Sequence, residues 1–202
     1  CEKQLAAGAM DCGCGFEDGT ACDLLSAQWF AHANARLDAD ARAWMESLPR
    51  RITFEFAGRR VAAIHGGWAG GPTAINRFLF ASQPDAAFAE EFAALEADIV
   101  LAGHCGLPFA RRLGDRLWLN AGVIGMPAND GSPATWFMIM EANGCHAFHP
   151  LSYDHAAAAR AMRQAGLAEG YAAGLETGLW PGLDILPDIE RRAAGKAIRA
   201  VA

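Results

Sequence analysis

The chain has 202 residues, of which 52% are hydrophobic and 20% charged, and its formal net charge is −6 at pH 7. This composition predicts one globular domain with a substantial core, and it excludes collagen-like repeats and extensive disorder. No apolar run approaches the roughly 20 residues that span a bilayer, and the basic residues are scattered. We therefore expect neither a membrane nor a nucleic acid as a partner.

The first 22 residues contain most of the cysteines: Cys1, Cys12, Cys14 and Cys22. Thiolates in a glycine-rich loop can hold structural zinc, but the spacing of Cys12, Cys14 and Cys22 is not that of standard zinc knuckles. Unpaired thiols or one disulfide are the alternatives. The six cysteines do not form the dense framework of a small secreted domain, so we expect a reducing, cytoplasmic location. Because the chain opens on a cysteine in a helical-looking segment, we expect that upstream sequence is missing.

The spacing of apolar residues predicts two amphipathic helices, over residues 23–36 and 38–48, with Asp38 as a cap. Polar and apolar residues then alternate over residues 51–56. A turn at Ala57-Gly58 and an apolar run over residues 60–64 complete a predicted hairpin whose second strand is buried. That second strand leads directly into His65.

Further along the chain, a helix over residues 84–96 and a buried strand over residues 98–102 lead to His104. Two hairpins are predicted next, over residues 109–119 and 135–150. A helix begins near residue 154. This order of elements predicts an α/β fold, with residues 1–150 in one domain and residues 151–202 as a helical extension that packs on it.

Two predicted strands thus each deliver a histidine at their carboxyl ends. A ligand at the end of a short strand is fixed in space before a metal arrives, and the adjacent Gly66 and Gly103 allow close approach of backbone and substrate. Imidazole nitrogens suit zinc, iron, manganese or nickel. For either histidine alone, a buried side chain satisfied by hydrogen bonds is the simpler interpretation. The pair at two strand ends favours a metal site.

Three ordered motifs accompany these histidines: His65-Gly66, the run from Gly103 to Phe109, and the loop from Asn120 to Pro127. They resemble H-G, G-H-x-H-x-P-F and N-x-G-S-x-G-x-P in the small bacterial branch of the calcineurin-like metallophosphoesterase family. The resemblance covers residues 50–142. It implies a β-sandwich flanked by helices in four layers, of which this chain would hold the C-terminal portion.

The resemblance also implies roles for individual residues. His65 and His104 would bind the same one of two metal ions, while Asn120 and Gly122 would shape the rim of the site. Gly106 stands where the family has a histidine that serves the other ion, so that second position is weakened. The family motifs D-x-H, G-D-x-x-x-x-G and G-N-H-[DE] cannot be located in this sequence. Cys1 could occupy the position of the histidine in the last of these, which protonates the leaving group.

The resulting hypothesis is a hydrolase of phosphate mono- or diesters that uses one or two divalent transition metal ions (Mn, Fe, Zn or Ni). Its partner would be a small phosphorylated substrate or a phosphoprotein. The alternative is a module on the same fold that binds a phosphorylated ligand without turning it over. Cys105 could be an alternative metal ligand or a nucleophile, although a small residue that fills a tight loop is the simpler interpretation. Phe78 and Phe80 could line a pocket or form a local core.

Overall fold

The computed structural model describes residues 2–198 and begins with three helices, α1 (Glu2–Ala6), α2 (Ala21–Asn34) and α3 (Ala39–Ser47). The side chain of Asp38 accepts a hydrogen bond from the backbone N–H of Ala41, which confirms the predicted cap of α3. The helix α2 begins earlier than the sequence predicted, because Thr20 takes the capping position and accepts from the N–H of Asp23.

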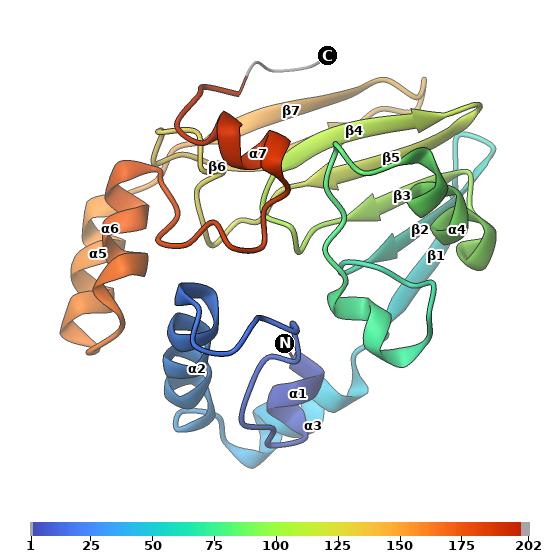
Figure 1. Ribbon diagram of the computed structural model, residues 1–202. Coiled ribbons are helices and arrows are strands. Elements are labelled where there is room, and N and C mark those ends of the chain that lie inside the picture. Colours follow the sequence, from blue (N-terminus) through green and yellow to red (C-terminus); the bar gives the residue numbers. More distant parts are fainter. Residues whose placement is uncertain (1, 199–202) are drawn as a thin grey trace.

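The strands form a five-stranded sheet in the order β1-β2-β3-β5-β4 and a two-stranded sheet of β6 and β7. Their bounds are β1 Arg51–Phe56, β2 Arg59–Ile64, β3 Ile99–Ala102, β4 Pro108–Leu113, β5 Arg116–Ala121, β6 Thr135–Met140 and β7 His146–Leu151. The three inner strands β2, β3 and β5 run parallel, whereas β1 and β4 pair antiparallel at the two edges. The carboxyl ends of the inner strands therefore meet at one end of the sheet (Figure 1).

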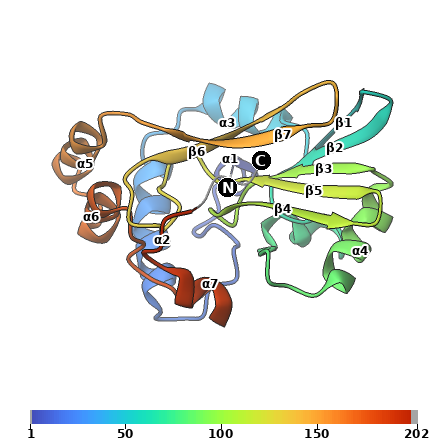
Figure 2. The same cartoon turned by 90° about the horizontal axis from the view of Figure 1, so that it is seen from above.

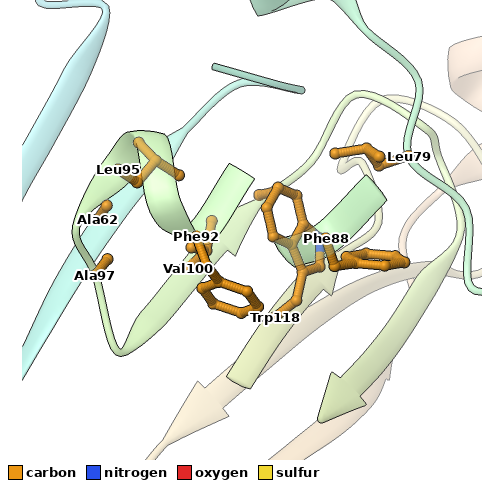
Figure 3. Packing of buried hydrophobic residues seen from close by; sticks show 9 residues of the cluster. Ala62, Leu79, Phe88, Phe92, Leu95, Ala97, Val100 and Trp118 are labelled. Carbon is orange, nitrogen blue, oxygen red and sulfur yellow. The ribbon is translucent and has the colours of Figure 1, made fainter. Parts of the chain in front are cut away.

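One face of the large sheet packs on helix α4 (Asp85–Leu95), and the other packs on the β6–β7 hairpin. On the helix side, Trp118 makes edge-on contacts with Phe88 and Phe92, with ring centroids 5.5 and 6.1 Å apart (Figure 3). On the hairpin side, the core is built from Val61, Ile99, Leu117, Leu119, Trp136 and Phe148. Both faces are covered, which explains why the inner strands are apolar without alternation.

The remaining helices are α5 (His155–Gln164), α6 (Glu169–Thr177), α7 (Asp188–Ala193) and the 3-10 helix η1 (Pro72–Asn76). Helices α5 and α6 pack side by side through the buried Ala159 and Ala172, and lie beside the sheets with α2 below them (Figures 1 and 2). The carboxylate of Glu190 on α7 accepts hydrogen bonds from Ser82 in the loop before α4. No helix in the described part of the chain is long and apolar enough to cross a bilayer.

Candidate metal centre

The two histidines that follow β2 and β3 lie next to one another. The ring centroids of His65 and His104 are 4.5 Å apart, at an interplanar angle of 52°. The parallel pairing of β2 with β3 places them there, and the N–H of Gly103 donates to the carbonyl of His65 at 2.9 Å. The convergence of the two imidazoles that the sequence predicted is therefore present in the structure.

The loop that carries His104 is tightly turned. His104 has a φ of +62°, and the N–H of Cys105 bonds back to the carbonyl of Gly103 at 2.7 Å. Asn120 is buried beneath this loop instead of lying at the rim. Its Nδ2 donates to the Gly103 carbonyl at 2.6 Å, and its Oδ1 accepts from the N–H of Gly122 at 3.0 Å. Asn120 thus joins the ends of β3 and β5 and fixes the position of the His104 ring.

Gly66 follows His65 in a position that leaves no room for a side chain. A Cβ there would lie 2.7 Å from the carbonyl oxygens of Ile75 and Arg77, and 3.1 Å from the ring of His104. Glycine at this position lets the η1 segment pack directly against the histidine pair.

Asn76 at the end of η1 contacts the second histidine, although no sequence motif marks this residue. Its backbone carbonyl lies 2.9 Å from Nε2 of His104. A carbonyl only accepts, so Nε2 carries the proton and the neutral ring keeps its lone pair on Nδ1. Metal-binding histidines commonly donate their other ring N–H in this way. The ring is also stacked on Phe78, with centroids 4.2 Å apart.

The protonation of both rings suits a metal ligand, which must be neutral. Burial, together with the neighbouring His65, lowers the pKa of His104 to about 3. Burial likewise lowers the pKa of His65. The Nε2 of His65 is buried and has no hydrogen-bond partner among the described residues. An unpartnered buried nitrogen beside a second imidazole is the arrangement that one bound cation would satisfy.

The histidine pair lies between two cavities. His65 borders one of about 710 Å³, which Glu2 of α1 also lines. His104 borders another of about 480 Å³, whose walls are mostly apolar and come from the N-terminal segment, the strand ends and the C-terminal helices. Residues that line this second cavity include Cys12, Phe78, Met126, Tyr171 and Trp180. A small organic group beside the rings would have room on the His104 side.

Gly106 stands where the resembling motif G-H-x-H has its second histidine, and Trp180 occupies the space that a side chain there would need. Gly106 has a φ of +78°, and a Cβ built there would lie 2.7 Å from Cζ2 of Trp180. Trp180 is held in place because its Nε1 donates to the carbonyl of Pro127 at 2.6 Å. The glycine is therefore part of a packed contact, and this loop contributes no ligand to a second metal ion at that point.

Within the described residues, the cysteines are not arranged as a metal cluster. Cys12, Cys14, Cys22 and Cys105 are all free thiols, and within residues 2–198 no group of three or more His, Cys, Asp or Glu side chains is placed to hold an ion. Cys105 is buried, and burial raises its pKa to about 12, so it stays a neutral thiol packed with Phe80. Cys1 lies outside the described residues.

Comparison with known proteins identifies the fold. No family model matches the sequence, and no curated protein matches it. A hypothetical protein from Pyrococcus horikoshii OT3 has a similar structure, with a TM-score of 0.68, 16% identity, and coverage of 89% of this chain and 71% of its own. A metallophosphoesterase from Sphaerobacter thermophilus follows, with a TM-score of 0.61, 21% identity, and coverage of 88% and 74%. The chain therefore has a mixed α/β fold of the metallophosphoesterase type, with a central sheet flanked by helices, as the resemblance predicted.

Proposed function

We propose that this chain provides part of the metal site of a phosphoric ester hydrolase, in which His65 and His104 bind one divalent transition metal ion. The observation that carries the proposal is the pair of adjacent neutral imidazoles, one of which has a buried and unpartnered Nε2. The fold is compatible with this activity. When bound, such an ion would polarise a phosphoryl oxygen and lower the pKa of a coordinated water.

The residues of the chain have separate tasks in this proposal. His65 and His104 hold the ion, while Asn76 and Asn120 fix the His104 ring and its loop. The apolar cavity next to His104 would receive the organic part of a phosphate mono- or diester. Two imidazoles leave further coordination positions open, and the family motifs that supply carboxylate and asparagine ligands have no counterpart in this sequence. We therefore expect the 202 residues alone to bind metal but to hydrolyse esters slowly.

Metal titration of the chain tests the proposal. Calorimetry with Mn²⁺ or Zn²⁺ should give one ion per chain, and His65→Ala and His104→Ala should each weaken the affinity by about tenfold or more. His32→Ala is the matched control, because His32 is a half-buried histidine on α2 that lines neither of the two cavities beside the pair. Equal affinities in all four proteins would contradict the proposal.

The alternative function is a module that binds a phosphorylated ligand without hydrolysing it. The contact of Gly106 with Trp180 favours this alternative, because it removes the family's ligand to a second ion. Turnover of p-nitrophenyl phosphate and of its bis ester with added Mn²⁺ separates the two functions. Metal-dependent turnover that is lost in His104→Ala supports the hydrolase. Metal-dependent binding of inorganic phosphate without any turnover supports the module.

A further inference from the structure

The edge strand β1 exposes most of its side chains to solvent, including two large apolar ones. Five of its six residues, Arg51 to Glu55, are exposed to solvent, including the apolar Ile52 and Phe54, which are 56% and 41% exposed. The strand stands at the end of the large sheet, next to β2 only (Figure 2). Proteins usually protect such edges with charged side chains, especially lysine, with proline or with a bulge. β1 has no lysine or proline, its two charged residues Arg51 and Glu55 are of opposite sign, and its pairing with β2 is unbroken over six residue pairs.

The turn after β1 determines which backbone groups face outward. Ala57 and Gly58 form a two-residue connection, with φ values of +52° and +72°, so Phe56 and Arg59 flank a tight hairpin turn. The flanking pair of such a hairpin exchanges backbone hydrogen bonds, and bonded pairs then alternate along the ladder. Phe56, Phe54 and Ile52 consequently direct their backbone groups to β2. Arg51, Thr53 and Glu55 direct theirs to the free edge.

We propose that β1 pairs antiparallel with β1 of a second copy of this chain, about a two-fold axis at Thr53. The sequence Arg51-Ile52-Thr53-Phe54-Glu55 is self-complementary in this register. Arg51 of each copy lies opposite Glu55 of the other, Ile52 lies opposite Phe54, and Thr53 lies opposite its own counterpart. Cross-strand pairs that stabilise sheets include pairs of opposite charge, pairs of an aromatic with a β-branched residue, and Thr–Thr pairs. All three kinds occur in this register.

The outward backbone groups select the same register. Pairing about Thr53 sets each outward-facing residue opposite another outward-facing residue, so all edge hydrogen bonds can form. A shift by one residue would place the outward-facing residues of one copy opposite residues of the other copy whose backbone groups already bond to β2, and these hydrogen bonds would be lost. A shift by two would leave Arg51 opposite Thr53 or outside the pair, and the charge complementarity would be lost. Only the register about Thr53 combines both requirements over the length of the strand.

The two faces of β1 support the same arrangement. Ile52 and Phe54 lie opposite Ala63 and Val61 of β2, on the sheet face that packs on β6–β7, so their pairing would extend an existing core. On the opposite face, the guanidinium of Arg51 lies over the ring of Trp68, 4.7 Å from its centroid. That contact holds the Arg51 side chain on the face where Glu55 of the second copy would meet it. Pairing would join the two five-stranded sheets into one continuous sheet.

Sedimentation analysis over a range of concentrations tests the proposal with charge reversals. The unmodified chain should dimerise reversibly. Arg51→Glu and Glu55→Arg each create two like-charge pairs and should raise the dimer dissociation constant by about tenfold or more. An equimolar mixture of these two variants restores opposite charges at both positions, so it should form a heterodimer. Arg112→Glu, an exposed arginine on the opposite edge strand β4, should leave the dimer unchanged.

Thr53→Pro gives a second, independent arm. It removes an outward-facing N–H without removing a bond to β2, so it should also weaken the dimer. Circular dichroism establishes that each variant is folded; if Thr53→Pro is not, the charge reversals carry the test. A wild-type chain that stays monomeric, single charge variants that dimerise like the wild type, or a mixture that fails to associate would each overturn the proposal.

Discussion

The carboxylate of Glu91 on α4 accepts hydrogen bonds from the backbone N–H of Trp68, at 2.7 Å, and of Ala69, at 3.0 Å. The side chain of Glu91 is fully buried and also forms an ion pair with Arg77 at 3.2 Å. Trp68 follows His65 closely in the chain, so this carboxylate attaches the loop after the first histidine to the helix that covers the sheet.

Glu91→Ala should therefore lower the free energy of unfolding by about 3–5 kcal/mol, because it leaves the N–H groups of Trp68 and Ala69 without an acceptor and removes one of the two carboxylates that Arg77 contacts. Glu90→Ala is the matched control. Glu90 is the preceding residue of α4 and also contacts Arg77, but it is exposed, and we expect a loss below about 0.5 kcal/mol. Denaturant unfolding measures both values. Similar losses in the two variants would show that the loop does not depend on Glu91.

A histidine placed at position 106 should destabilise the protein. In Gly106→His the new Cβ would collide with Trp180, and the positive φ adds backbone strain, so we expect a loss of stability of about 2–4 kcal/mol. In Gly106→His combined with Trp180→Ala, the loss should be smaller than the sum of the two single losses. Unfolding curves for the set of three variants check this expectation. Strictly additive losses would mean that Trp180 is not the obstacle.

The stability of the metal-free protein should depend on pH through His104. Its pKa in the folded protein is about 3, whereas an unfolded histidine titrates near 6.5. Between these values the unfolded chain binds a proton that the folded chain does not. Stability is therefore complete above about pH 6.5 and decreases as the pH falls toward 3, by at most about 1.4 kcal/mol per pH unit.

His104→Gln should flatten this dependence, since glutamine does not titrate. Urea unfolding at several pH values, with a chelator present, measures the slope for the wild type and the variant. His32→Gln, at a half-buried position on α2 away from the histidine pair, should retain the wild-type slope. An unchanged slope in His104→Gln would assign the pH dependence to other groups.

The thiol of Cys12 is mostly buried but lines the apolar cavity, and it should be ionised at neutral pH. A hydrogen bond from Cys14 lowers the pKa of Cys12 to about 6, while burial opposes the shift. Cys14→Ala removes that bond, so the pKa of Cys12 should return toward about 8.5 and its alkylation by iodoacetamide at pH 7 should slow by about tenfold or more. Mass spectrometry of the Cys12 peptide measures the rate. Cys22→Ala serves as the control, and equal rates in the Cys14 and Cys22 variants would refute the assignment.

The sequence predicted those parts of the molecule that have strong local signals. The hairpin predicted over residues 135–150 is β6–β7, with Asn143-Gly144 in its turn, and the apolar runs before His65 and before Gly103 predicted β2 and β3. From these strands the meeting of the two histidines followed, because the carboxyl ends of parallel strands lie together. Local sequence patterns, together with the rule that the carboxyl ends of parallel strands lie together, were sufficient to predict these strands and the histidine pair.

Contacts between distant segments could not be predicted in the same way. Asn76 has no motif that marks it as the partner of His104, 28 residues away. No pattern indicated that Trp180 fills the space beside Gly106. For Phe78 the sequence left a pocket wall and a local core as alternatives. The structure combines them, because Phe78 lines the apolar cavity and also stacks on His104.

Asn76 is bonded in two directions at once. Its side-chain Nδ2 donates to the carbonyls of Cys12 and Gly13 at 3.0 and 3.2 Å, while its own carbonyl bonds the His104 ring. A molecule that enters the cavity beside Cys12 and displaces that backbone would therefore also move the Asn76 carbonyl that sets the tautomer of His104. The nitrogen chemical shifts of this one imidazole should then report on occupancy of the cavity.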